Sequence, residues 1–165
     1  MFESIAKTVA LISTKAKVSV LGRETEKENL MTCDWHMPVS KEPALYAFAI
    51  KKSRYTYKLI EKSKIFVVNI LPYPKKDAAE FCGTKSGEFI DKFKESGLTK
   101  IEAEKLNCSC IKEATTKIEC ELFNEIEAGD HQIIIGKIIS IHENREKKPL
   151  IHFQKKYTTL KNATS

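Results

Sequence analysis

A group of hydroxyl and basic side chains stands where a helix is predicted to begin. Ser53, Arg54 and Thr56 follow an apolar strand-like run and precede a segment with helical periodicity. The free N–H groups of a helix N-terminus attract anions, and an arginine can bind a phosphate through two parallel hydrogen bonds. The spacing is compatible with a phosphate site, but taken alone it favours the simpler interpretation, an ordinary helix cap beside a surface arginine.

A rigid polar loop comes before this helix start. Residues 30–36 pass from apolar to polar, and Pro38 and Pro43 restrict the backbone that follows. Only one apolar run, residues 44–50, separates the loop from the helix start. A planar ligand with a phosphate tail would therefore fit across both elements.

Apolar and β-branched runs predict a chain that is mainly β. The predicted strands are residues 8–13, 18–21, 29–33, 44–50, 65–71, 117–126 and 131–142. In the 117–126 strand, Glu119 is expected on the polar side, opposite the apolar side chains. Gly136 in mid-strand predicts a bulge or a close approach of backbone. Since no β-α-β alternation occurs, we expect one domain, residues 1–165, built as an antiparallel barrel.

Helical periodicity is confined to short segments. The predicted helices are residues 54–62, 77–82 and a short one around 89–93. Ser53 is expected to cap the first helix and Gly83 to end the second. The charged run 22–28 is predicted as an exposed turn, and residues 98–114 as irregular structure.

The order of the motifs resembles a known family. The pattern N-x-M-T-x-x-W-x-x-P-V-S runs from Asn29 to Ser40, and S-R-x-T runs from Ser53 to Thr56. Further similar segments are 66–71, 86–87, 91–93, 118–120 and 129–133. In this order the chain resembles the flavin reductase-like proteins of the FMN-binding split-barrel fold, which include flavoredoxin and archaeal ferric reductase-like proteins.

The resemblance implies a split antiparallel β-barrel with short helices that dimerises with FMN near the interface. It assigns the phosphate to Ser53, Arg54 and Thr56. The residues implied to face the isoalloxazine ring, largely through backbone N–H groups, are Asn29, Met31, Thr32, Cys33, Asp34 and Trp35. Ser40 is implied as a further cofactor contact, with turn stabilisation as its alternative. Trp35 is equally consistent with a core tryptophan, and nothing near Cys33 in sequence lowers the pKa of its thiol.

Two further segments have functional and structural interpretations side by side. Lys85 and Ser86 lie in a loop bounded by glycines that would close over the ligand or would simply be solvated. His131, after a Gly-Asp turn, resembles a family position near the flavin face where the electron donor approaches. A lone histidine is more often structural, and that alternative stays open for His131.

The activity implied by the resemblance is an NAD(P)H-dependent flavin reductase. No G-x-G-x-x-G or P-loop motif occurs, so NADH or NADPH is expected to bind only transiently. A non-enzymatic FMN electron carrier, served by an electron-transfer protein, is the alternative from a second class. A third is a basic interaction protein without flavin, which the colour of the purified protein would exclude.

Composition limits the remaining classes. The chain is 30% charged with a net charge of +6, but its lysines are interleaved with acids along the whole length. This pattern favours a solvated surface with a mild attraction for anions over nucleic-acid binding. No apolar run is long enough for a membrane helix and no secretory signal is evident, so a cytoplasmic protein is expected. The five cysteines are expected to be reduced, because their number is odd and no secretory signal is evident. No metal is expected, because Cys108 and Cys110 lack a second pair for zinc.

Overall fold

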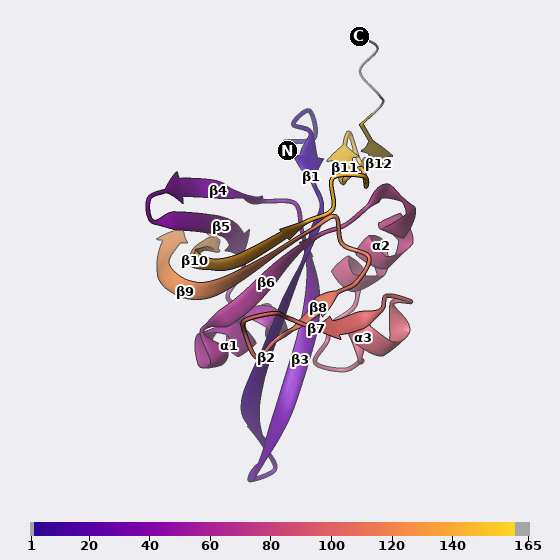
Figure 1. Cartoon of the computed structure of the whole chain (residues 1–165). Coiled ribbons are helices and arrows are strands. Elements are labelled where there is room, and N and C mark those ends of the chain that lie inside the picture. The colour runs from indigo at the N-terminus through magenta and orange to yellow at the C-terminus, as the bar shows by residue number, and fades with distance from the viewer. Residues whose placement is uncertain (1, 161–165) are drawn as a thin grey trace.

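A seven-stranded antiparallel sheet forms the body of the protein in the computed structural model, which describes residues 2–160 (Figure 1). Its strands follow the order β3-β2-β6-β9-β10-β5-β4. Their bounds are β2 Ala10–Val20, β3 Arg23–Cys33, β4 His36–Lys41, β5 Ala44–Ile50, β6 Ile65–Ile70, β9 Thr116–Ala128 and β10 His131–Glu143. The predicted mainly antiparallel fold with few short helices is thus confirmed.

Smaller elements surround this sheet. The short strands are β1 Lys7–Thr8, β7 Lys100–Glu102, β8 Ser109–Ile111, β11 Leu150–Phe153 and β12 Lys156–Thr159. They form a three-stranded sheet, β1-β11-β12, and a two-stranded sheet, β7-β8. The helices are α1 Tyr55–Ser63, α2 Lys76–Thr84 and α3 Lys92–Glu95, with a 3-10 turn Tyr73–Lys75 before α2. Residues 98–114, predicted as irregular, therefore include two strands.

The alternation of side chains along β2 divides the interior into two apolar clusters. Ala10 and Ile12 face one cluster, which contains Phe48 and Phe66. Leu11 faces the other, which packs helices α2 and α3 against the sheet. Because neighbouring residues of a strand point to opposite faces, one short run of sequence supplies both clusters. At roughly 25 cal/mol per Å² of apolar surface, this two-sided burial is the main stabilisation of the fold.

The turn predicted over residues 22–28 is confirmed only at Gly22, because residues 23–28 belong to strand β3. β2 and β3 form one long hairpin that extends away from the rest of the protein (Figure 1). Only Leu21 and Gly22 turn the chain, with φ of 51° and 76°. The charges suit a strand because they pair across the hairpin, as Lys15 does with Glu26 at 3.1 Å.

The proline-containing segment after the site loop is also a strand. β4 tolerates Pro38 because it lies at the edge of the sheet, where a missing N–H costs no ladder hydrogen bond. The register shifts between Pro38 and Ser40. The following Glu42–Pro43 peptide bond is cis.

Both predicted helix caps were wrong. The N-cap of α1 is Arg54 rather than Ser53, and no side chain caps this helix. Gly83 lies inside α2, which continues to Thr84. A Cβ at Gly83 would lie 3.4 Å from Cβ of Thr32, which is an ordinary van der Waals contact, so packing against β3 does not require a glycine here.

Two predictions about strands β9 and β10 have different outcomes. Gly136 lies at a register shift, and a Cβ there would be 2.6 Å from Cβ of Cys120, which confirms the predicted close approach. Glu119 was expected on the polar face but is 5% exposed. Its carboxylate accepts the backbone N–H groups of residues 104–106, so burial of the charge is compensated by three hydrogen bonds.

Candidate functional site

A cavity of about 310 Å³ opens where the end of β3, the start of α1 and the loop after α2 meet. We call it the cationic cavity. Of the predicted site residues, it is lined by Asn29, Met31, Thr32, Ser53, Arg54, Thr56, Lys85 and Ser86. The fold thus gathers the predicted phosphate residues and the glycine-bounded loop around one space. Lys58 of α1 and Glu88 of that loop form an ion pair at 3.9 Å, which holds the loop beside α1.

The side chains that line the cationic cavity carry positive charge, and none of them is acidic. Lys51, Arg54, Lys85 and Lys92 line it, and no aspartate or glutamate does. Lys51 pairs with Asp130 at 2.9 Å, whereas Arg54 has no ion pair within residues 2–160. A cavity with several cations and no internal counter-charge has a positive potential that favours an anionic ligand.

Polar groups at the start of α1 add hydrogen-bond donors. The first turn of α1 has neither a side-chain cap nor an acidic residue, so its free N–H groups remain available to an anion. The buried Thr56 hydroxyl accepts a hydrogen bond from Nδ2 of Asn29 at 2.8 Å. Oδ1 of Asn29 is buried and has no partner in the described part of the chain. A buried amide oxygen without a partner is costly, and because it can only accept, the partner it lacks is a hydrogen-bond donor and not a phosphate oxygen.

A second cavity of about 200 Å³ adjoins the first and is called here the strand-edge cavity. The two share Met31, Thr32, Lys51 and Arg54. Of the remaining predicted residues, the strand-edge cavity adds Cys33, Asp34, Trp35 and His131. β3 is the terminal strand of its sheet, so its outer edge has backbone groups without a strand partner. Such an edge presents the backbone donors that a flat heterocycle needs.

Trp35 and His131 form one wall of the strand-edge cavity. Their ring centroids are 5.0 Å apart, and Trp35 is 42% exposed, so the core interpretation of this tryptophan was wrong. Nδ1 of His131 lies 2.6 Å from Asp130, which also pairs with Lys51. Hydrogen bonds from Lys51 and His131 lower the pKa of Asp130 to about 2. Nε2 of His131 has no hydrogen-bond partner among residues 2–160.

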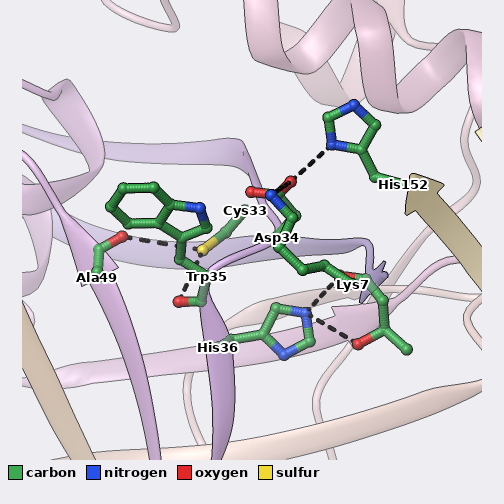
Figure 2. Close-up of polar contacts among 8 residues, drawn as sticks. Lys7, Cys33, Asp34, Trp35, His36, Ala49 and His152 are labelled. Atoms are coloured by element: carbon green, nitrogen blue, oxygen red, sulfur yellow. Dashed lines mark hydrogen bonds and ion pairs between the residues drawn. The ribbon is translucent and has the colours of Figure 1, made fainter. Parts of the chain in front are cut away.

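Cys33 and Asp34 are held by contacts within the protein (Figure 2). Burial raises the pKa of the Cys33 thiol to about 12, and Sγ lies 3.5 Å from the carbonyl oxygen of Trp35. This excludes an activated thiolate at neutral pH. Asp34 pairs with Lys7 at 3.0 Å and with His152 at 2.7 Å, which ties the loop to β1 and β11.

The structure also places the remaining residues that the sequence analysis considered, and it assigns neither Ser40 nor His36 to the two cavities. Ser40 lies on β4 and lines neither cavity. His36 uses both ring nitrogens within the fold, toward Tyr46 at 2.7 Å and the carbonyl of Thr8 at 3.0 Å. The predicted site residues did not include Lys51 and Lys92. Lys51 stands in lysine-rich surroundings, whereas Lys92 lies in the segment 91–93 that resembles the family but was given no role there.

The other features raised by the sequence add no second site. All five cysteines are free and buried. Within residues 2–160 there is no group of three or more metal-ligating side chains, and no helix is long and apolar enough to cross a membrane.

Comparison with known proteins identifies the family. A family model described as a flavin reductase like domain matches residues 2–161. The chain belongs to this flavin reductase-like family, and the predicted family and split-barrel fold are thereby confirmed.

Three similar proteins illustrate the family. An uncharacterised protein of Archaeoglobus fulgidus is 35% identical over 132 residues, which cover 78% of this chain and 75% of that protein. The reductase component of 4-hydroxyphenylacetate 3-monooxygenase from Thermus thermophilus is 27% identical over 97% of both chains. The NADH:FAD oxidoreductase SgcE6 of Streptomyces globisporus, solved in complex with NAD and FAD fragments, superposes with a TM-score of 0.85 at 18% identity, over 99% of this chain and 91% of that one.

Proposed function

We propose that this protein is an FMN-dependent flavin reductase that takes electrons from NADH or NADPH. The observation that carries the proposal is the cationic cavity, which has four basic side chains and no acid and adjoins the strand-edge cavity. The pair of cavities suits a ligand with an anionic tail and a flat head. Ser53, Arg54, Thr56 and the first turn of α1 would bind the phosphate.

The edge of β3 would hold the isoalloxazine ring. Residues 31–35 line the strand-edge cavity, and Trp35 supplies an aromatic wall. Bound flavin supplies reversible hydride chemistry, while the protein supplies binding and orientation. His131, fixed through Nδ1 by Asp130, would orient the nicotinamide with its free Nε2. Cys33 has no redox role in this proposal, because its thiol stays protonated.

The names of related proteins support the reductase over a plain electron carrier. The Thermus thermophilus relative is a reductase component, and SgcE6 is an NADH:FAD oxidoreductase. We infer that reduced flavin passes to a separate acceptor and that the protein works in the cytoplasm, without nucleic acid or membrane.

An exposed apolar surface supports a homodimer. β4 and the β9–β10 pair, which are separated by β5 in the sheet, expose large apolar side chains. These side chains are Met37, Val39, Phe123, Ile126, Ile139 and Ile141. Patches of this kind commonly mark interfaces, and isologous pairing is the commonest way to cover them. Sedimentation should give about twice 18.8 kDa, and a flavin-bound monomer would contradict the dimer.

The function is tested by one titration series. Flavin-free protein is titrated with FMN and with riboflavin, and the FMN complex is then mixed anaerobically with NADH or NADPH. We expect FMN to bind at least about tenfold more tightly than riboflavin, since hydrogen bonds to a charged group contribute about 1.5–3 kcal/mol each. We also expect at least one nucleotide to bleach the flavin absorbance.

Each failure has a distinct meaning. Equal affinity for FMN and riboflavin would remove the phosphate role of the cationic cavity. Absence of flavin binding would overturn the proposed function altogether. If dithionite bleaches the flavin but neither nucleotide does, the protein is an electron carrier rather than a reductase.

A further inference from the structure

A third cavity, of about 410 Å³, lies beside the strand-edge cavity and is called here the apolar cavity. Eight of its eleven lining residues are apolar, and the other three are Lys7, Asp34 and His36. The proposed flavin site uses the cationic and strand-edge cavities. The apolar cavity therefore has no role in the proposed function.

Two alanines of β5 create this hollow. Ala47 and Ala49 lie on the outer face of the strand, whereas the larger residues that alternate with them pack into the interior. On the neighbouring strands, Met37 is the partner of Ala47 and Ile133 is the partner of Ala49. Alanine is depleted in strands because its side chain covers little of the sheet surface, and here it leaves a space between two longer side chains.

Aromatic side chains form a wall beside the hollow. Trp35 lines the apolar cavity, and the ring of Phe2 meets it edge-on, with ring centroids 5.9 Å apart. Trp35 also lines the strand-edge cavity, together with Asp34 and Ala49. The apolar cavity and the strand-edge cavity thus share this tryptophan as a common wall.

The polar side chains of the lining have partners within the protein. Asp34 pairs with Lys7 at 3.0 Å and with His152 at 2.7 Å (Figure 2). His36 uses both ring nitrogens within the fold. A charged ligand would lose its hydration in this cavity without compensation. The lining therefore selects an uncharged, flat and apolar molecule.

We propose that the apolar cavity binds a neutral aromatic electron acceptor of the quinone class. This inference rests on the proposed function, because reduced flavin in the strand-edge cavity supplies the electrons. A ligand behind Trp35 does not touch the flavin, and hydride transfer requires the reacting atoms to be in contact. The ligand must therefore accept electrons singly across the indole ring. Quinones are neutral and flat, and they accept electrons in this way.

The reaction balances without a further reactant. The quinone takes up two electrons and two protons, so that both of its carbonyl groups become hydroxyl groups. The neutral, fully reduced flavin gives up the same number of electrons and protons and returns to its oxidised form. The protein forms no covalent bond in this step. Its residues hold the quinone over Ala47 and Ala49 and against Trp35.

A second copy of the chain is the competing occupant. Met37 is 61% exposed and belongs to the apolar surface that supports the proposed dimer. Phe2 and Ile5 of the same chain, however, already line the hollow from the N-terminal side, which favours a small ligand over a bulky partner. If a partner chain filled the cavity, a larger side chain at Ala47 would weaken the dimer.

The methyl groups of two methionines report on the cavities separately. Met37 lines the apolar cavity, whereas Met31 lines the two cavities of the flavin site. Isotope-labelled methionine methyl groups are followed by NMR, first with FMN and then with added quinone, and are assigned with Met31→Leu and Met37→Leu. The probe is a naphthoquinone whose quinone ring is fully methylated, so that it does not react with thiols. We expect FMN to shift Met31, and the quinone to shift Met37 while leaving Met31 nearly unchanged.

Ala47→Leu fills the hollow without changing a residue that lines either flavin cavity. We expect it to weaken quinone binding by about tenfold or more and FMN binding by less than about twofold. Leu45→Ile is the matched control, because Leu45 lies on the same face of β5 but outside the cavity. This variant should match the wild type with both ligands.

A kinetic measurement tests the electron transfer itself. The FMN complex is reduced with a stoichiometric amount of dithionite, so that no nicotinamide is needed, and is then mixed anaerobically with the quinone or with ferricyanide. Ferricyanide is a small inorganic acceptor that does not need an apolar site. Ala47→Leu should slow flavin reoxidation by the quinone by about tenfold or more, and reoxidation by ferricyanide by less than about twofold.

The outcomes separate this proposal from the proposed function. If FMN leaves Met31 unshifted, the proposed flavin site fails, while the Met37 signal still decides whether the quinone binds. A Met37 signal that the quinone does not shift, or a shift that Ala47→Leu preserves, would overturn the quinone site. A quinone that shifts Met31 as strongly as Met37 occupies the flavin site instead, which would also overturn it. Equal slowing of both acceptors would refute electron transfer through this cavity, and loss of the dimer in Ala47→Leu would identify the cavity as an interface between copies.

Discussion

Two buried charges in this molecule are treated in opposite ways. The Glu119 carboxylate accepts three backbone N–H groups from residues 104–106, at 2.7, 2.9 and 2.9 Å. In the cationic cavity, the Lys92 ammonium has two carbonyl partners and no carboxylate, and Arg54 has no ion pair within residues 2–160. Asn29 adds a buried oxygen without a partner.

The difference distinguishes charged groups that are satisfied within the protein from groups that a ligand would satisfy. Around Glu119, the chain supplies every hydrogen bond that the charge needs, so the group can only serve stability. Around the cationic cavity, the chain leaves cationic donors short of acceptors and leaves Oδ1 of Asn29 short of a donor. Because unpaired buried polar groups are costly, such an arrangement persists where something outside the chain completes it. Removal of a group such as Glu119 should therefore lower stability and leave FMN affinity unchanged. Removal of a group such as Arg54 should lower FMN affinity and leave stability unchanged.

The largest expected effect is on stability, from Glu119→Ala. The substitution leaves three partly buried N–H groups without their acceptor, which should lower the free energy of unfolding by about 3 kcal/mol. The affinity for FMN should stay within about twofold of the wild type. Urea unfolding measures the first quantity and flavin titration the second. Glu121→Ala, an exposed glutamate of the same strand, is the control and should change neither.

Arg54→Ala should give the reverse result. Loss of the guanidinium should weaken FMN by about thirtyfold, equivalent to about 2 kcal/mol, because hydrogen bonds to charged groups are strong. Stability should be unchanged or slightly raised, since Arg54 repels Lys92 and is paired with no acid among the described residues. Riboflavin titration is the internal control. A loss of stability without a loss of FMN affinity would break the comparison.

The sequence predicted those site residues and strands that depend only on a local pattern. Ser53, Arg54 and Thr56 are three positions of one short motif, and the structure brings all three to the cationic cavity. The strand 44–50 was predicted with its observed bounds, because a compact apolar run between polar ends leaves little ambiguity.

The parts that depend on distant contacts were missed for a physical reason. Glu119 follows the alternation of an exposed face, and only the loop 104–106 folding over it makes the position buried. Lys92 is one of many lysines, and its burial follows from the carbonyls of Leu30 and Cys82, far away in sequence. Residues 23–28 were predicted as part of a turn and not as a strand, because charges that pair across strands have the composition of a solvated loop.

Gly87→Ala tests how closely the cavity wall is fitted to Asn29. A methyl group at Gly87 would collide with the Asn29 amide, so that side chain must move and its bond to Thr56 should weaken. We expect FMN affinity to fall by up to about tenfold with little loss of stability. The double variant Asn29→Ala/Gly87→Ala should lose less than the sum of the two single changes, because the collision is gone. Additive losses would show that Gly87 acts through another contact.

The smallest effect on stability should come from substitution of Asp34. This residue tests the comparison because it borders the strand-edge cavity, yet its carboxylate, like that of Glu119, has its partners within the chain. Burial opposes ionisation of Asp34, but the hydrogen bonds from His152 and Lys7 outweigh it and lower its pKa below the ordinary value of 3.8. Its ionised form therefore contributes stability that is fully present above the ordinary pKa and is lost as the pH falls through the lower folded-state pKa.

Asp34→Asn should accordingly lower the free energy of unfolding by about 1 kcal/mol at neutral pH, since the lost pair is partly exposed. The difference from the wild type should stay constant down to about pH 5 and shrink as Asp34 becomes protonated. Urea unfolding at several pH values measures this difference. FMN affinity should change by less than about twofold, because partners within the chain already satisfy the carboxylate. A difference that persists in acid would mean that Asp34 contributes through packing and not through its charge. A large loss of FMN affinity would instead mean that Asp34, like Arg54, binds the ligand. Hydrogen bonds within the chain would then no longer distinguish a charge that stabilises the fold from a charge that binds the flavin.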